Sequence, residues 1–167
     1  MKKDIIQNKK DLVYLSNKSI NQIKRKALSN NRKRARICLH KSLNDKTSEM
    51  IIALNKKSFI SPHIHPDNKS ESYHIIKGEM DVYIFNSKGK LLKKIQMGEF
   101  NSKKNFFYRM CKGFYHMPFP RSKWCIYHET YSGPFKKKID VKYPKWAPDE
   151  SKRLEVINFL KRHNIKY

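Results

Sequence analysis

The chain has 167 residues, of which 38% are hydrophobic and 12% aromatic, enough for one domain with its own core. The formal net charge of +24 comes from 30 lysines and 8 arginines. Because lysine recognises phosphates less specifically than arginine, we interpret this charge as a compositional bias, and nucleic acid is not an expected partner. No run is long enough to span a membrane, and the N-terminus lacks the apolar core of a signal peptide. The sequence therefore predicts a cytoplasmic protein.

The first 33 residues are polar, and they predict a helical extension rather than part of the main domain. The apolar residues Ile20, Ile23, Ala27 and Leu28 recur at the spacing of one helical stripe. Ser19 is a candidate for the helix N-cap. Residues 1–33 are thus expected to form an N-terminal helical extension, followed by a β domain over residues 34–147.

The middle of the chain has the sequence pattern of β-structure, with short apolar runs separated by turn residues. Strands are expected at residues 37–40, 50–54, 58–63, 72–77, 80–85, 90–97, 106–110, 115–118 and 123–131, with a hairpin turn at 86–89. Many short strands at regular spacing predict a sandwich or a jelly-roll barrel.

The last 20 residues, 148–167, change character again and predict a C-terminal helix that packs on the barrel. Asp149 and Glu150 stand where its first turn is expected, and Leu154, Ile157 and Leu160 form its apolar stripe. The acidic start agrees with the helix dipole.

One segment carries most of the chemical information. His63 and His65 are two residues apart, so on a strand their side chains point the same way. Glu71 follows after a five-residue gap, Gly78 closes the unit, and His116 is the best candidate for a distant fourth ligand. Three imidazoles and one carboxylate suit one divalent ion, with Zn²⁺ or Fe²⁺ first and Mn²⁺, Ni²⁺ or Co²⁺ as alternatives.

The spacing of these residues resembles the two motifs of the cupin superfamily. Four blocks in order also resemble the WbuC family of cupin-fold metalloproteins; they cover residues 32–42, 62–71, 129–135 and 146–150. Tyr115 departs from the tryptophan that often precedes the third histidine, and the second motif is incomplete. The resemblance extends over nearly the whole chain.

This resemblance implies a mainly β fold, namely a single cupin jelly-roll β-barrel with short N-terminal and C-terminal helices. It also implies a link with bacterial surface-polysaccharide (O-antigen or capsule) biosynthesis, and a carbohydrate or nucleotide-sugar as the small-molecule partner. Cupin barrels commonly pair, so we expect a homodimer. The resemblance does not supply a reaction.

A metal-dependent enzyme of the isomerase or epimerase type would need a base beside the metal. Lys69 is the first candidate because it is two residues from Glu71; Glu129 and His40 are the others. Arg36, Lys41 and Arg109 are candidates for binding an anionic group of the substrate. Two alternatives stay open at this point: an Fe(II)-dependent dioxygenase and a non-catalytic ligand-binding or regulatory module.

Overall fold

The computed structural model describes residues 4–167, and it confirms a mainly β architecture with few, short helices. The strands are β1 (Ile5–Gln7), β2 (Arg34–Cys38), β3 (Thr47–Asn55), β4 (Glu71–Lys77), β5 (Met80–Phe85), β6 (Leu91–Met97), β7 (Phe107–Met110), β8 (Tyr115–Pro120) and β9 (Trp124–Ser132). The helices are α1 (Asn17–Leu28), α2 (Lys137–Asp140) and α3 (Arg153–Arg162).

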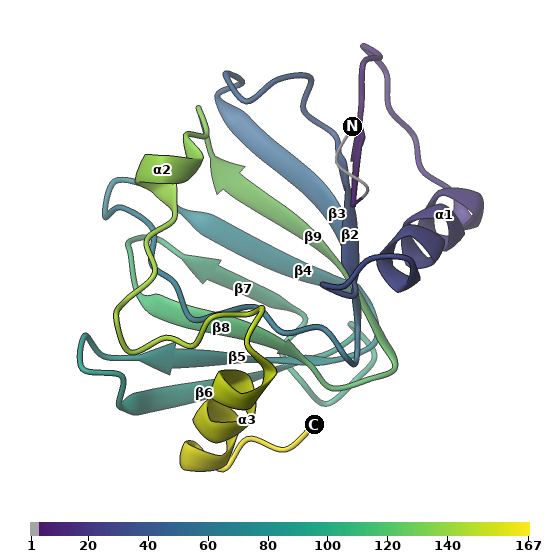
Figure 1. The fold of residues 1–167 in the computed structure, drawn as a ribbon. Coiled ribbons are helices and arrows are strands. Elements are labelled where there is room, and N and C mark those ends of the chain that lie inside the picture. Colours follow the sequence, from purple (N-terminus) through teal and green to yellow (C-terminus); the bar gives the residue numbers. More distant parts are fainter. Residues whose placement is uncertain (1–3) are drawn as a thin grey trace.

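The strands form two facing sheets (Figure 1), one with the order β1-β2-β3-β9-β4-β7 and the other with the order β6-β5-β8. All pairings between neighbouring strands are antiparallel except that of β1 with β2. Side chains from both sheets, among them Tyr73, Tyr127, Val82 and Met97, fill the space between them. The core is therefore that of a two-layered barrel.

The N-terminal segment differs from the expected helical extension because it also contains a strand. β1 pairs with β2 and extends the larger sheet, while α1 lies on the outer face of that sheet. Ile23 and Ala27 are fully buried there, against apolar residues of β2, β3 and β9. The helix N-cap is Ser16, one turn before the expected Ser19, whose hydroxyl accepts a hydrogen bond from the Ser16 N–H. The first three residues of the expected extension, 1–3, lie outside the described residues.

The C-terminal helix α3 covers the outer face of the smaller sheet. Val156, Phe159 and Leu160 are buried against Phe85 and Phe119. The helix begins at Arg153, later than residue 148, where the sequence predicted its start. Within residues 4–167, no helix combines the length and the apolar character needed to cross a membrane.

The segment between β3 and β4 corrects one strand prediction. Residues 58–63 were expected to form a strand, but only His63 and Ile64 make isolated bridges, to His116 and Lys142. The prolines Pro62 and Pro66 lack backbone N–H donors, so a regular ladder cannot continue through them. The segment instead runs extended across the open side between the two sheets (Figure 1).

Candidate metal centre

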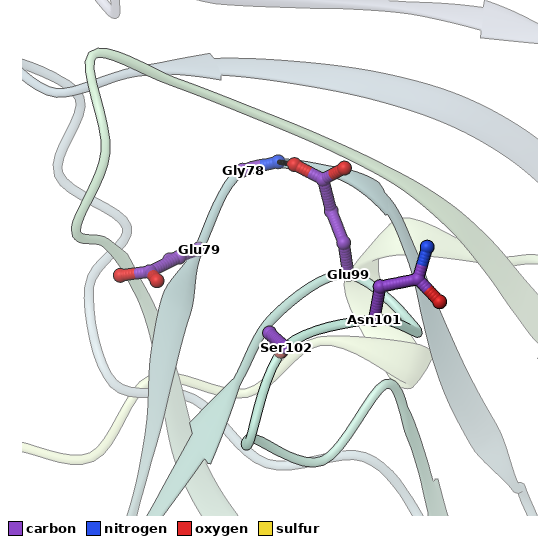
Figure 2. Close-up of a pocket in the computed structure, with 5 residues that line it drawn as sticks. All are labelled: Gly78, Glu79, Glu99, Asn101 and Ser102. Atoms are coloured by element: carbon purple, nitrogen blue, oxygen red, sulfur yellow. Dashed lines mark hydrogen bonds between the residues drawn. The ribbon is translucent and has the colours of Figure 1, made fainter.

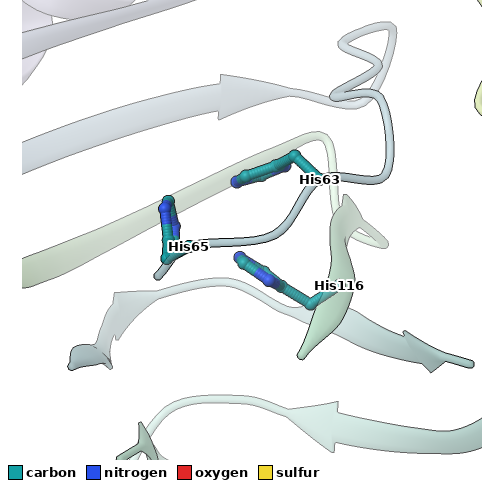
Figure 3. A group of neighbouring side chains, drawn as sticks. All are labelled: His63, His65 and His116. Atoms are coloured by element: carbon teal, nitrogen blue, oxygen red, sulfur yellow. The ribbon is translucent and has the colours of Figure 1, made fainter. Parts of the chain in front are cut away.

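Three histidines from two distant parts of the chain meet at one point (Figure 3). His63 and His65 come from the segment before β4, and His116 is the second residue of β8. One ring nitrogen from each lies within 4.8 Å of the others, and all three residues are buried. The backbones of His63 and His116 exchange two hydrogen bonds, with N–O distances of 3.1 and 2.9 Å. This bridge fixes the spacing between the two chain segments.

Each histidine ring is oriented by a backbone carbonyl. The Nδ1 atoms of His63, His65 and His116 lie 3.0, 2.5 and 2.9 Å from the carbonyl oxygens of Ser61, Asp140 and Phe114 respectively. A carbonyl can only accept a hydrogen bond, so each Nδ1 must carry the hydrogen. In the neutral ring, Nε2 is then a free lone pair directed at the common centre, as histidine ligands of metals require.

Glu71, the first residue of β4, brings a carboxylate to the same centre. Its two oxygens lie 3.1 Å from Nε2 of His65 and 3.1 Å from Nε2 of His116. Glu71 Oε2 and His116 Nε2 have no hydrogen-bond partner among the described residues. Lone pairs facing one another at this distance repel unless a cation lies between them. The arrangement fits a divalent metal ion, or in its absence a proton shared between His65 and Glu71.

The electrostatics of His63, His65 and Glu71 agree with this interpretation. Burial, helped by the neighbouring His116 and His65, lowers the pKa of His63 to about 3. Burial also opposes protonation of His65, but the hydrogen bond and charge of Glu71 outweigh it and raise the pKa of His65. Although burial would raise the pKa of Glu71, His116 and His65 hold that pKa well below its usual range. Glu71 is therefore an ionised carboxylate at neutral pH.

Glu129 lies on the same inner face of the larger sheet, one step further along the strands. Tyr131 on β9 stands opposite Glu71, and Glu129, two residues earlier, stands opposite Tyr73. Burial, followed by the charge of Glu71, raises the pKa of Glu129 to about 8. The hydroxyl of Tyr127 lies 3.4 Å from its carboxylate as a hydrogen-bond donor. Glu129 is thus a carboxyl group that can hold or release a proton near neutral pH.

The other two candidate bases are engaged elsewhere. The Lys69 ammonium group donates to the carbonyls of Ser132, Gly133 and Pro134, at 3.2, 2.9 and 3.1 Å. Those contacts stabilise the chain where it leaves β9. The His40 ring accepts a hydrogen bond from the backbone N–H of Glu49 at 3.0 Å.

The three candidate anion-binding residues lie in different surroundings. Lys41 pairs with Asp11 at the surface. Arg109 donates to the hydroxyls of Ser70 and Ser72, 3.1 Å from each. Arg36 projects from the inner face of β2, in register with Ile52 of the barrel core. Of these three residues, the register places Arg36 inside the barrel.

Sequence reasoning missed several residues that support the centre. The ring of Tyr131 lies 4.8 Å from that of His65, and the ring of Tyr143 lies 6.0 Å from that of His63. Asp140 supplies the carbonyl that orients His65, and its own carboxylate accepts a hydrogen bond from the backbone N–H of Lys136. No local pattern in the sequence could have revealed a backbone carbonyl as a partner.

A surface hollow of about 250 Å³ lies at the other end of β4 (Figure 2), lined by Gly78, Glu79, Glu99, Asn101 and Ser102. Gly78 has a φ of +84°, and a Cβ there would lie 2.1 Å from the carbonyl oxygen of Trp124, so glycine is required by the turn. Its N–H donates to Glu99, and Glu79 pairs with Lys104. Both carboxylates of the hollow, Glu79 and Glu99, are thus paired with groups of the protein itself. We therefore interpret the hollow as part of a turn.

Comparisons with known proteins support the fold. Residues 15–97 match a family model described as a domain of unknown function (DUF6016), and no curated protein sequence matches the chain. Protein SO0799 from Shewanella oneidensis has a similar structure, with a TM-score of 0.50 and 14% identity over 60% of this chain and 63% of that chain.

Two further similar structures are of proteins whose names state an activity or a role. Oxalate oxidase in complex with the substrate analogue glycolate aligns with a TM-score of 0.52 and 18% identity, over 69% of this chain and 57% of that chain. The capsular polysaccharide assembling protein CapF from Staphylococcus aureus aligns with a TM-score of 0.54 and 9% identity, over 69% of this chain and 32% of that chain. At these identities the similarity shows the fold alone, and the predicted jelly-roll β fold is confirmed.

Proposed function

We propose that this chain is a metal-dependent enzyme that acts on a sugar or nucleotide-sugar, and that His63, His65, His116 and Glu71 hold the metal. The observation that carries the proposal is the orientation of the three rings. Each Nδ1 faces a backbone carbonyl, so each Nε2 points to the position that Glu71 also faces, where an ion would replace the proton shared between His65 and Glu71. A buried cluster of three imidazoles and one carboxylate has few functions other than metal binding.

The sequence blocks that resemble the WbuC family support the choice of substrate, because they converge on the centre. Block 62–71 supplies His63, His65 and Glu71, and block 129–135 begins with Glu129. Block 32–42 places Arg36 on the inner face of β2. The similarity to CapF, titled as a capsular polysaccharide assembling protein, agrees with a role in surface-polysaccharide biosynthesis.

Three imidazoles and one carboxylate suit Zn²⁺ or Fe²⁺, and Mn²⁺, Ni²⁺ or Co²⁺ as alternatives. Such an ion supplies Lewis acidity, which polarises a carbonyl or a hydroxyl of the bound sugar. Glu129 is the residue that we assign to proton transfer, since it lies half-buried on the same inner face as Glu71 and its pKa is about 8. Tyr127 orients that carboxyl through its hydroxyl. An isomerisation or epimerisation needs this kind of proton transfer.

The proposal is tested first by metal binding. Metal-stripped protein is titrated with Zn²⁺, and with Fe²⁺ under anaerobic conditions, in competition with a chromophoric chelator. We expect the wild type to bind one equivalent of metal and the H116A variant to bind it at least ~100-fold more weakly. Loss of a residue that only orients a ligand already weakens metal binding by about 10–100-fold, and loss of the ligand itself should cost at least as much. His74→Ala is the matched control, since His74 is an exposed histidine on the outer face of β4. Equal affinity in wild type and H116A would refute the site.

Turnover is the second part of the test. The metal-loaded protein is incubated with a panel of nucleotide-sugars and free sugars in D₂O, and proton exchange and product formation are followed by NMR. We expect exchange at one carbon-bound position with at least one sugar, and its loss in Glu129→Gln. Metal binding without exchange or conversion on any sugar of a broad panel would argue for the alternative below.

A non-catalytic ligand-binding or regulatory module is the second candidate, because the centre is closely covered. His116 is fully buried, and the ring of His65 donates a hydrogen bond to the carbonyl oxygen of Asp140. Structural metal sites are closed by protein ligands, whereas catalytic sites keep an open position. The absorption spectrum of the Co²⁺-substituted protein distinguishes the two: added azide changes it only if an open position exists.

A further inference from the structure

Buried polar atoms without a partner gather around the proposed metal centre. In the part of the chain that the structure describes, seven buried side-chain atoms have no hydrogen-bond partner. Five of the seven belong to residues of the centre or of the inner barrel face, namely Arg36 Nε, Ser48 Oγ, Glu71 Oε2, His116 Nε2 and the Tyr131 hydroxyl. Glu71 Oε2 and His116 Nε2 face the proposed metal position, so Arg36 Nε, Ser48 Oγ and the Tyr131 hydroxyl are the atoms that another ligand could pair.

The strand register gives the order of these groups along the inner face. Tyr131 stands opposite both Ser48 and Glu71, next to the metal centre. Glu129 follows two residues earlier on β9, opposite Met50. One step further, Arg36 stands opposite Ile52, which is the neighbour of Tyr127. The polar groups thus form a line from Glu71 past Glu129 towards Arg36.

Arg36 differs from the arginines around it because it has no carboxylate partner. Arg34 pairs with Glu150 at 2.7 Å, and Arg121 pairs with Asp81 at 2.6 Å. No carboxylate of residues 4–167 lies within ion-pair distance of Arg36, whose nearby side chain is the Cys38 thiol, a weak acceptor. A half-buried guanidinium group on the inner face of a barrel, without a carboxylate partner, is suited to a planar or tetrahedral anion that can accept two of its hydrogen bonds.

We infer that Arg36 binds the anionic group of the substrate, and that the substrate is therefore an acidic or phosphorylated sugar. This inference rests on the proposed function, because it assumes that the sugar also reaches the metal centre. Arg36 and Glu71 lie on strands separated by β3 and β9, with adjacent strands about 4.8 Å apart. A simple inorganic anion cannot contact both ends of this line, whereas a sugar that carries a carboxylate or phosphate can.

The surface that leads to the centre agrees with an anionic substrate. The segment 134–148 supplies the carbonyl that caps His65, and it carries five exposed lysines: Lys136, Lys137, Lys138, Lys142 and Lys145. Asp140 is the acidic residue of this segment, and it is buried. The exposed charges of this segment are therefore all positive, which raises the local concentration of anions and their rate of association.

The test compares matched sugars on the Zn²⁺-loaded protein by calorimetry: D-glucuronate, D-glucose 6-phosphate and D-glucose. We expect at least one of the acidic sugars to bind at least ~10-fold more tightly than glucose, since charge-assisted hydrogen bonds are the strong ones. Which of the two is preferred distinguishes a carboxylate from a phosphate. In Arg36→Gln we expect a loss of at least ~10-fold for the preferred acidic sugar and a change within ~2-fold for glucose.

Arg109→Gln is the matched control, because it removes the same charge from an arginine that bonds to serine hydroxyls. A carboxylate can also bind Zn²⁺ directly, so the comparison of R36Q with R109Q decides the assignment. The inference is overturned if R36Q keeps the preference, if acidic and neutral sugars bind alike, or if neither acidic sugar binds the wild type. Failure of Zn²⁺ to bind would instead refute the proposed function, and the chelator titration of the same samples reports it separately.

The unfolding temperature of R36Q provides a second measurement. Since Arg36 has no carboxylate partner, R36Q should unfold at the same temperature as the wild type or a higher one when no ligand is present. The same change at Arg34, which is buried and paired with Glu150, should lower the unfolding temperature. A clear loss of stability in R36Q would indicate a structural role.

Discussion

At the scale of single residues, the centre depends on backbone groups as much as on side chains. The three histidines are usable as ligands because the carbonyls of Ser61, Phe114 and Asp140 hold their Nδ1 hydrogens. Lys69 shows the opposite case. Its position two residues before Glu71 made it the first candidate base, but three carbonyls hold its ammonium group. Distance along the sequence does not give the direction of a long side chain.

The raised pKa of Glu129 predicts how stability changes with pH. The pKa is about 8 in the folded protein and 4.5 ordinarily, so between these values the folded state keeps a proton that the unfolded state has lost. The wild type should therefore lose stability as the pH rises from 5 to 8, whereas Glu129→Gln, which mimics the protonated form, should not.

We expect E129Q and wild type to be equally stable near pH 5, and E129Q to be more stable at pH 8 by roughly 1–3 kcal/mol. Urea unfolding of both metal-free proteins across this range measures the difference. A difference independent of pH would show that Glu129 titrates normally.

At the scale of elements, the segment that carries His63 and His65 is held by contacts rather than by a strand ladder. Glu150, just before α3, accepts hydrogen bonds from the backbone N–H of Ser61 at 3.0 Å and from Arg34 at 2.7 Å. Ser61 in turn donates to the carbonyl of Pro148. This contact joins the C-terminal segment, β2 and the chain just before the two histidines, so three distant parts of the chain meet at one carboxylate.

Removal of Glu150 should therefore weaken both the fold and the metal centre. We expect Glu150→Ala to lower the free energy of unfolding by about 2–4 kcal/mol, because the mostly buried Arg34 loses its partner. Zn²⁺ affinity should also fall, since the Ser61 carbonyl that orients His63 is released.

The matched control is Glu155→Ala, which breaks a pair with Lys152 on the surface of α3 and should cost less than about 0.5 kcal/mol. Chemical denaturation and chelator competition measure the two quantities. Equal effects of the two substitutions would show that the Glu150 contact has no special role.

At the scale of the whole molecule, two facing sheets bring together residues that are far apart in the chain. A bound ion would join the segment before β4, β4 itself and β8, and so link the smaller sheet to the larger one. The expected homodimer and the cytoplasmic location stay predictions.

Metal binding should stabilise the whole fold. Zn²⁺ at about 100 times its dissociation constant adds about 2.7 kcal/mol, which raises the unfolding temperature of a domain of this size by roughly 5–10 °C. A chelator should reverse the shift, and H116A should show little of it. Thermal scans with and without Zn²⁺ provide the measurement, and an unchanged midpoint in the wild type would contradict a folded-state site.

The sequence by itself determined the fold class and brought forward the four candidate ligands, because the alternation of apolar residues and the HxH spacing are local patterns. It could not determine which other residues reach the centre. Lys69 was preferred to Glu129 and His40 as the base, and Arg36 was one of three candidates for anion binding. Only the register of β2, β3, β9 and β4 placed Arg36 and Glu129 on one inner face. Which residues reach the centre depends on long-range strand pairing and on hydrogen bonds to backbone carbonyls. No local sequence pattern predicts either of them.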